Sequence, residues 1–517
     1  MDFDEILEHV GGYGKYQKRT ILLMALACII SSSSLYEPVF QSFEPDHWCA
    51  TPEWNDFNCS KNGLTESECR DYKKYASIPY TVTESNETVY SRCTKYDVSN
   101  VPFRWDLEPN IYNSSVIDCD AGWVYNHSEY ESTLVTDFDL VCGKQILLNF
   151  AHAVCFTGVS VGAVLFGVIA DRLGRLFAFY LAVIPTGIIG TIVAFSPNFT
   201  VYVTFRGLIG ICAQSILTIT LLIGTEIVEP SRRIRAGFLI YLGYSLGSIL
   251  LVSVAYFVKN WRLLQLTLSA PVFFTLFFIP ILHKSPRWLL STGKNEEASK
   301  VVRKISIDNK NDFPEKLFSR TDMIKKEIEA NEQEEVTLIH LLRSPILVGR
   351  TFILLHNWFL YNLTYTSFFL YSGYDNNVYL SFALAAVAEV PASLITMALV
   401  ERVGRRKFIM PLTLLAGVSC LLIAFLESPY NFIFVVIGKF AICSAYNTNI
   451  IYTTEVYPTP LRSIIKIFQF KMWSDNSRYL SFLPVFICTT TPLIQALSTV
   501  LHHSNIWRSW ETIHQQQ

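Results

Sequence analysis

Long apolar segments recur along most of this chain, and each is about as long as a membrane-spanning helix. A helix rises 1.5 Å per residue, so about 20 apolar residues cross the roughly 30 Å hydrocarbon layer of a bilayer. Ten segments before residue 455 have this character: 20–40, 145–169, 177–196, 202–225, 237–258, 263–282, 349–370, 379–400, 408–426 and 431–453. The pattern predicts an all-α polytopic membrane protein rather than a soluble domain with one anchor.

The basic residues between these segments predict an orientation. The first segment follows residues 1–19, which are mixed in charge, and no small-residue cleavage site ends it, so we interpret it as an anchor rather than a signal peptide. The arginines and lysines concentrate in alternate short loops, as the positive-inside rule requires: Arg172, Arg175, Arg232, Arg233, Arg235, Arg402, Arg405, Arg406 and Lys407. We therefore expect a cytoplasmic N-terminus, with the plasma membrane as the location.

Composition agrees with this prediction. Hydrophobic residues make up 51% of the 517 residues and charged residues 17%, whereas soluble domains carry about 25% charged residues. The formal net charge of −2 gives no indication of a nucleic-acid partner. The chain has neither the phosphate-binding G-x-x-x-x-G-K-[ST] pattern of ATP-driven pumps nor the zinc-binding H-E-x-x-H pattern of metalloproteases. We expect no enzyme activity, no metal and no cofactor.

The loop at 42–142, between the first two segments, has the character of an exported loop. It contains six cysteines, an even number that predicts up to three disulfides among fifteen pairings: Cys49, Cys59, Cys69, Cys93, Cys119 and Cys142. Four Asn-x-Ser/Thr glycosylation sequons begin in the same loop, at Asn58, Asn86, Asn113 and Asn126. Together they predict an extracellular, glycosylated loop, which is also a candidate surface for oligomerisation.

A second long loop, 283–348, has no cysteine and many lysines and glutamates, with helix-period stretches at 294–305 and 321–335. We interpret it as a cytoplasmic helical linker between two halves of the protein, 20–282 and 349–462. Regulation through phosphorylation or a partner is the alternative interpretation of this loop.

Two charged motifs recur at nearly the same offset, which indicates that the halves are duplicated. ADRLGR at 170–175 matches VERVGR at 400–405, 230 positions later, and TEIVEPSRR at 225–233 matches TEVYPTPLR at 454–462, 229 positions later. Such parallel repeats are typical of transporters whose halves rock about a central site.

The acids and arginines of these motifs predict a gate. Carboxylates and guanidinium groups at helix ends can form charge-assisted hydrogen bonds that fasten the halves when the site faces outward. Simple positive-inside anchoring is the alternative, but it does not explain the matched acids. The gating candidates are Asp171, Arg172, Arg175, Glu226, Arg233, Glu401, Arg402, Arg405, Glu455 and Arg462.

The same motifs resemble those of known transporters. GVIADRLGR resembles the signature loop of the major facilitator superfamily, in which each half has six helices. MDFDEILEHVGGYGKYQ, the cysteine-rich loop, NWRLLQL at 260–266, SPRWLL at 285–290 and TTEVYPTPLR together resemble the organic cation, carnitine and anion transporter family, solute carrier family 22. His283 and Lys284 depart slightly from the proline and glutamate that this family usually has before SPRWL.

The resemblance implies twelve spans, no catalytic cofactor and movement of amphiphilic organic ions, by facilitated diffusion, exchange or coupling to sodium. Coupling to protons is a further expectation. The implied partners are a small organic ion and membrane lipid.

Polar residues inside the apolar segments are the candidates for substrate binding, because a charge in hydrocarbon is costly and is retained for function. Glu389 could attract a cation, and Trp358, Tyr361 and Tyr365 share one helical face that could hold an ammonium group by cation–π attraction. An aromatic stripe that only packs is the alternative. The other candidates are Gln214, Lys439, Tyr446 and Asn447, and Lys439 could pair with Glu389 or hold the carboxylate of a zwitterion such as carnitine.

The repeat pattern ends after Arg462. The region where an eleventh span would fall carries Lys466, Lys471, Asp475 and Arg478, and such charges cost about 2.5–3.5 kcal/mol each at a helix centre. We therefore expect 463–517 to be an atypical tail, with one candidate span at 479–501. Our hypothesis is that this tail comes from an alternative exon, a read-through intron or a frame change, and a genuinely divergent C-terminus is the alternative. A transport-impaired chain with a binding or regulatory role is thus one alternative function, and an organic anion transporter is another.

Overall fold

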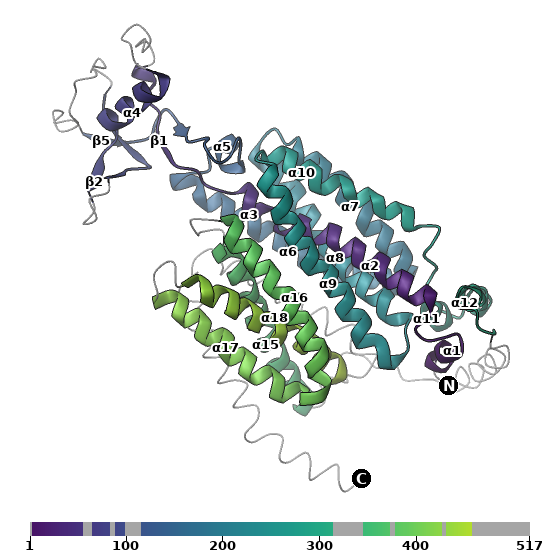
Figure 1. Cartoon of the computed structure of the whole chain (residues 1–517). Helices are drawn as coiled ribbons and strands as arrows, with labels where there is room; N and C mark the ends of the chain where they lie inside the picture. Colours follow the sequence, from purple (N-terminus) through teal and green to yellow (C-terminus); the bar gives the residue numbers. More distant parts are fainter. Residues whose placement is uncertain are drawn as a thin grey trace. The chain divides into compact units, whose positions relative to one another are not determined.

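The computed structural model describes residues 3–54, 65–82, 88–98, 115–313, 345–372, 378–425 and 431–456. Two compact units are distinguished within it (Figure 1). Unit 1 is the helical bundle, formed by the described parts of 1–40, 151–257 and 262–517. Unit 2 is formed by the described parts of 41–150 together with 258–261. The predicted loop 42–142 thus corresponds to most of unit 2.

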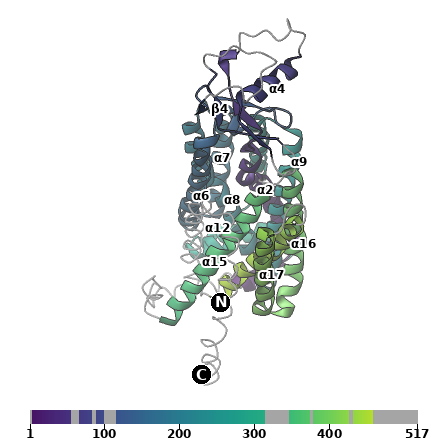
Figure 2. The same ribbon diagram turned by 90° about the vertical axis from the view of Figure 1, so that its left-hand side faces the viewer.

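A helix occupies each of the ten predicted spans. In the first half these are α2 (Lys15–Tyr36), α6 (Gln145–Leu173), α7 (Arg175–Ala194), α8 (Phe199–Glu226), α9 (Arg233–Phe257) and α10 (Trp261–Ser269) with its 3₁₀ continuation η6 (Ala270–Phe278). In the second half they are α15 (Pro345–Ser372), α16 (Val378–Val403), α17 (Arg405–Phe425) and α18 (Asn431–Val456). In Figure 2 most of these helices lie side by side with their axes roughly aligned.

Nine helical segments among the described residues are long and apolar enough to cross a membrane. The tenth predicted span, α15, is not one of the nine, and it carries His356, Asn357 and Asn362 among its apolar residues. The all-α polytopic prediction is therefore confirmed, and α15 carries several polar residues among its apolar ones.

Short helices lie before, between and after the spans of the first half. They are α1 (Phe3–His9), the 3₁₀ turn η5 (Pro230–Arg232), α11 (Pro286–Ser291) and α12 (Asn295–Asn309). Helix α12 occupies the predicted helical stretch 294–305, whereas the stretch 321–335 lies outside the described residues. Asn309 at the end of α12 accepts a hydrogen bond from the backbone N–H of Tyr16 (3.0 Å), so the linker contacts the start of α2.

Glycines let the helices of the first half approach one another closely. A Cβ added at Gly158 or Gly162 of α6 would meet the backbone of α8, and one at Gly243 or Gly247 of α9 would meet the backbone of α2. Both pairs belong to G-x-S-x-G sequences, at 158–162 and 243–247, a pattern that serine hydrolases place on a strand-to-helix turn. Here both sequences lie inside helices, where their glycines serve packing.

The two halves meet along α9 and α16, which lie side by side in Figure 1. Phe238 of α9 packs against Val400 of α16 near one end of these helices. Toward the other end, Phe40 stacks on Tyr379 with ring centroids 5.5 Å apart, and it contacts Phe382 edge to face at 5.1 Å. Apolar contacts near both ends of α16 therefore join the halves.

The described residues of unit 2 form three two-stranded antiparallel sheets. Strand β1 (His47–Cys49) pairs with β6 (Trp123–Tyr125), β2 (Tyr80–Val82) with β3 (Thr88–Tyr90), and β4 (Thr94–Tyr96) with β5 (Val116–Asp118). The helices of this region are α4 (Glu66–Ser77) and α5 (Leu134–Phe138), with the 3₁₀ turns η1 (Pro52–Trp54) and η4 (Cys142–Lys144). The short helix α3 (Pro38–Gln41) lies where the chain passes from unit 1 to unit 2. Strands this short cannot bury a large core, so covalent links contribute much of the stability.

Disulfides join the small sheets of unit 2. Cys49 on β1 is bonded to Cys119, and Cys93 is bonded to Cys142. Cys69 is also disulfide-bonded, and Cys59 lies outside the described residues. Of the four sequons only Asn126 is described, and its side-chain oxygen accepts a hydrogen bond from the backbone of Ser128 (3.2 Å).

A buried lysine adds a polar link within unit 2. The Nζ atom of Lys95 lies 2.7 Å from Asp120 and 3.2 Å from Glu53, and its side chain is 1% exposed. Burial by itself lowers the pKa of Lys95, but the hydrogen bonds to Asp120 and Glu53 outweigh it and leave the pKa above its ordinary value. The lysine therefore stays charged and bridges η1 to the segment after β5.

A buried ion pair ties α8 to the end of α2 in unit 1. Arg206 of α8 is 1% exposed and donates to the carboxylate of Glu37, which is fully buried. The same guanidinium donates to the backbone oxygens of Ser34 (3.0 Å) and Leu35 (3.4 Å). The last carbonyl groups of a helix have no hydrogen-bond donor within the helix. Arg206 therefore supplies a donor to two carbonyl groups at the end of α2.

We expect Arg206→Leu to lower the free energy of unfolding by about 3–5 kcal/mol, because Glu37 would remain buried without its partner. Thermal unfolding of the purified protein in detergent measures the change. The double variant Glu37→Leu/Arg206→Leu removes both charges and should recover most of the loss. Equal instability of the single and double variants would contradict this account.

Candidate functional site

A small cavity of about 50 Å³ lies within the helical bundle of unit 1. Helices α2, α8 and α9 of the first half and α15, α16 and α18 of the second half line it, through Tyr36, Gln214, Leu217, Tyr241, Tyr244, Ser245, Asn362, Tyr365, Thr366, Glu389, Ser393, Cys443, Tyr446 and Asn447. The cavity therefore lies where the duplicated halves meet.

Glu389 of α16 is the acidic side chain at this cavity. It is 1% exposed, and its Oε1 atom accepts a hydrogen bond from the Tyr365 hydroxyl of α15 (2.5 Å). The Nζ atom of Lys439, from α18, lies 3.2 Å from the same oxygen. Three helices of the second half are thus joined at one carboxylate, because a buried charge requires polar partners.

Aromatic rings continue from this carboxylate along α15 and α18. Tyr446 stacks on Tyr365 with centroids 5.5 Å apart, and Trp358 contacts Tyr446 edge to face at 5.2 Å. Trp358 also donates from Nε1 to the hydroxyl of Thr453 (3.0 Å). Asn447, one turn from Cys443, donates to the Ser393 hydroxyl (3.2 Å). Tyr365 and Tyr446 therefore present aromatic surface beside Glu389.

The predicted substrate residues fall into two groups. Gln214, Tyr365, Glu389, Tyr446 and Asn447 line the cavity. Trp358 and Lys439 are not lining residues, but each contacts one that is.

Tyr361 lies elsewhere. Its hydroxyl bonds to Thr413 of α17 (3.1 Å), and it belongs to an apolar cluster of α15, α17 and α18. Of the aromatic face predicted from the spacing, Tyr365 therefore lines the cavity, whereas Tyr361 packs against other helices.

Sequence reasoning missed the tyrosines that the first half contributes. Tyr36, Tyr241 and Tyr244 line the cavity, and the rings of Tyr36 and Tyr244 meet edge to face with centroids 6.2 Å apart. The spacing of three between Tyr241 and Tyr244 could have indicated these residues, because it places both on one face of α9. A tyrosine in an apolar segment has no charge to mark it, so this face was not distinguished from packing.

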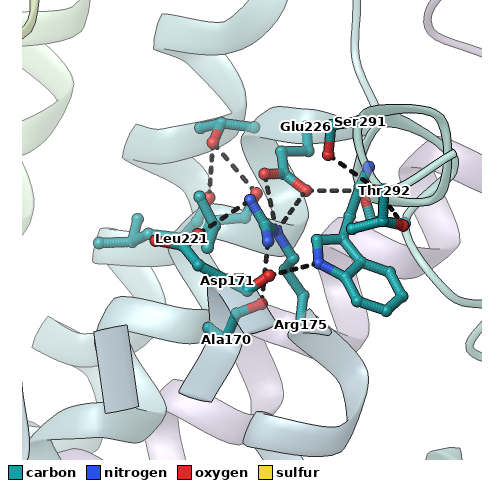
Figure 3. A network of polar contacts seen from close by, with 11 residues as sticks. Ala170, Asp171, Arg175, Leu221, Glu226, Ser291 and Thr292 are labelled. Atoms are coloured by element: carbon teal, nitrogen blue, oxygen red, sulfur yellow. Dashed lines mark hydrogen bonds and ion pairs between the residues drawn. The ribbon is translucent and has the colours of Figure 1, made fainter. Parts of the chain in front are cut away.

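The first copy of the charged motif forms a compact polar network (Figure 3). Arg175 at the start of α7 donates from Nε to both carboxylate oxygens of Glu226 on α8 (3.0 and 3.2 Å) and lies 3.3 Å from Asp171. Ser285 donates to Glu226 (2.6 Å), and Trp288 of α11 donates to the backbone oxygen of Asp171 (2.7 Å). The contacts of Arg175 and Glu226 thus join α6, α7 and α8 to the linker.

Arg233 belongs to a neighbouring ion pair. It pairs with Asp4 of α1, and Arg287 of α11 lies 3.7 Å from the same carboxylate. Arg172, Glu401 and Arg402 have exposed side chains, and Arg405 is half-buried. Glu455 is in the last turn of α18, but its side chain is outside the described residues. Arg462 lies wholly outside the described residues. A fastening of the two halves by these groups stays a prediction.

Backbone geometry supports the repeat itself. Gly174 and Gly404, the matched glycines of the two motifs, have φ angles of 101° and 88° and separate α6 from α7 and α16 from α17. Only glycine adopts such angles readily. A Cβ at Gly174 would also meet the ring of Trp288 at 3.0 Å.

Known proteins are similar to this chain in sequence. The family model for sugar and other transporters matches residues 113–472, which extends past Arg462. Solute carrier family 22 member 2 of Rattus norvegicus is 30% identical over 473 residues, covering 89% of this chain and 83% of that protein. The chain belongs to solute carrier family 22.

Other family 22 relatives agree. Solute carrier family 22 member 3 of Rattus norvegicus is 29% identical over 473 residues, covering 89% of this family 22 chain and 83% of that protein. The organic cation transporter protein of Drosophila melanogaster is 28% identical over 483 residues, covering 90% of this chain and 83% of that protein.

Solved structures share the fold of this family 22 chain. The partially occluded, inward-open xylose transporter XylE from E. coli aligns with a TM-score of 0.62 at 14% identity, covering 95% of this chain and 100% of that one. The human organic anion transporter MFSD10 (TETRAN) aligns with a TM-score of 0.53 at 12% identity, covering 94% and 98%. The fold is that of the major facilitator superfamily, as predicted.

We expect Glu226→Gln to lower the free energy of unfolding by about 1.5–3 kcal/mol, because hydrogen bonds between charged groups contribute about this much. Thermal unfolding of the purified protein measures it. The control is Glu401→Gln, an exposed carboxylate of the second motif, which should change stability by less than about 0.5 kcal/mol. If both variants unfolded like the wild type, the Arg175 network would have no role in stability.

Proposed function

We propose that this chain carries small organic ions across a membrane by alternating access, with organic cations or zwitterions such as carnitine as its substrates. The observation that carries the proposal is the cavity lined by helices of both halves, with Glu389 in its wall. A site between two halves can open to either side of the membrane when the halves rock. The organic cation transporter protein of Drosophila melanogaster is a relative over most of the chain.

The chemistry of the lining supports a substrate with an ammonium group. Five tyrosines line the cavity: Tyr36, Tyr241, Tyr244, Tyr365 and Tyr446. An aromatic face attracts an organic cation by about 0.5–2 kcal/mol. Hydroxyl and amide groups such as Ser393 and Asn447 can orient a polar substituent without adding charge.

The two alternatives have less support. For an organic anion, the described lining contributes Glu389 but neither a lysine nor an arginine. A transport-impaired chain with a binding or regulatory role rests on the tail 463–517, which lies outside the described residues. Transport is therefore the function that we propose.

The remaining features of the proposal come from the sequence. We place the N-terminus in the cytoplasm on the basis of the alternating arginine-rich loops, and we propose the plasma membrane as the location. We also propose coupling of transport to sodium or protons. Uptake can be measured with and without a gradient of either ion. Oligomerisation through unit 2 is a further part of the proposal.

Uptake of radiolabelled tetraethylammonium and carnitine into cells expressing the full chain tests the function. We expect saturable uptake above that of untransfected cells for at least one of them. Glu389→Gln should reduce that uptake by about tenfold or more, because it removes the buried charge that attracts an ammonium group. The control is Glu296→Gln, an exposed carboxylate on α12, which should transport like the wild type.

Surface labelling verifies that each variant reaches the plasma membrane. If correctly trafficked wild-type protein showed no uptake, exchange or binding of any organic ion, the transport proposal would be abandoned.

A further inference from the structure

Lys439 places one of the protein's own ammonium groups beside Glu389. Its Nζ atom lies 3.2 Å from Oε1 of Glu389, and 3.3 Å from the centroid of the Tyr365 ring. It also donates to the backbone oxygen of Tyr365 (3.4 Å). A carboxylate and an aromatic face are the two groups that hold an organic cation, and here both already contact one of the protein's own.

The lysine lies behind the cavity wall. The Lys439 side chain is 0% exposed and is not among the lining residues, whereas Tyr365 and Glu389 are. Both Tyr365 and Lys439 contact Oε1 of Glu389, so Oε2 is engaged by neither of these contacts. A solute in the cavity therefore meets Glu389 with its charge already balanced.

The rest of the described lining adds no charge. Apart from Glu389, the lining consists of tyrosines, one leucine, one cysteine, and serine, threonine, asparagine and glutamine side chains. The Glu389–Lys439 pair has a net charge of zero, and so does the described cavity. A simple monovalent cation would enter without a net opposite charge and would lie close to the ammonium group of Lys439.

We propose that Lys439 is a specificity-determining residue, which neutralises Glu389 and makes the cavity selective for zwitterions over simple monovalent cations. A zwitterion brings an anionic group of its own, so it can interact with both members of the pair while the total charge stays zero. This inference rests on the proposed function, since it assigns the substrate class of the same cavity.

A series of four proteins tests the inference by changing the charge of the pair in steps. The wild type and the double variant Glu389→Gln/Lys439→Gln have a net charge of zero, Lys439→Gln has a charge of −1, and Glu389→Gln has a charge of +1. Binding of glycine betaine, tetraethylammonium and benzoate to the purified full-length proteins is measured by isothermal titration calorimetry. These probes are a zwitterion, a cation and an anion.

We expect the preferred probe to follow the charge of the pair. The wild type should bind glycine betaine more tightly than tetraethylammonium. In Lys439→Gln the affinity for tetraethylammonium should rise by about tenfold or more, because a repulsive charge a few ångströms away is removed. Glu389→Gln should shift the preference toward benzoate, and the double variant should again prefer the zwitterion. Lys439→Arg, which keeps the charge, should behave like the wild type.

The matched control is Lys407→Gln, an exposed lysine after the second motif, which should leave all three affinities unchanged. If Lys439→Gln fails to fold, the Glu389→Gln and double variants still decide the inference through the benzoate and betaine affinities. Affinities that do not change along the series, in a wild type that binds organic ions, overturn the inference alone. A wild type that neither binds nor transports any organic ion overturns the proposed function as well.

Discussion

The structure depends on one constraint, which is that a charged group inside an apolar helical bundle needs a partner of opposite charge. Glu37 with Arg206 satisfies it in the first half, and Glu389 with Lys439 satisfies it in the second. Leaving either partner alone in a low-dielectric interior is strongly destabilising. Each pair therefore fixes the relative positions of the helices that carry it, α2 with α8 and α16 with α18.

The two pairs differ in what surrounds them. Arg206 also donates from Nη2 to the backbone oxygens of Ser34 and Leu35, so the first pair is part of the helix packing. Glu389 instead lies in the wall of a cavity with tyrosines on several sides. The same physical requirement thus produces a structural link in one half and a chemically specific site at the junction of the halves. The close glycine contacts between α2 and α9 bring the tyrosines of α9 near enough to complete that site.

Sequence reasoning located the helices well and the site in part. Glu389 and Gln214 were identifiable because a polar group stands out in an apolar segment. Tyr361 was predicted to share the face of Tyr365, yet it bonds to Thr413 on α17, because helical spacing does not reveal which neighbour a face meets. Tyr36, Tyr241 and Tyr244 could not be assigned without knowing that α2 and α9 face the second half.

The sequence by itself located the ten spans before residue 455, the repeat and the family, because each of these is encoded in local pattern or in motifs. Matched glycines at 174 and 404 even specify the turns between helices, through a backbone angle that other residues avoid. Only the tertiary structure decided that Lys439 neutralises Glu389 and that Arg175 bonds to Glu226 and Glu226 to Ser285. These contacts join residues separated by 50 or more positions, so their partners depend on how the helices pack.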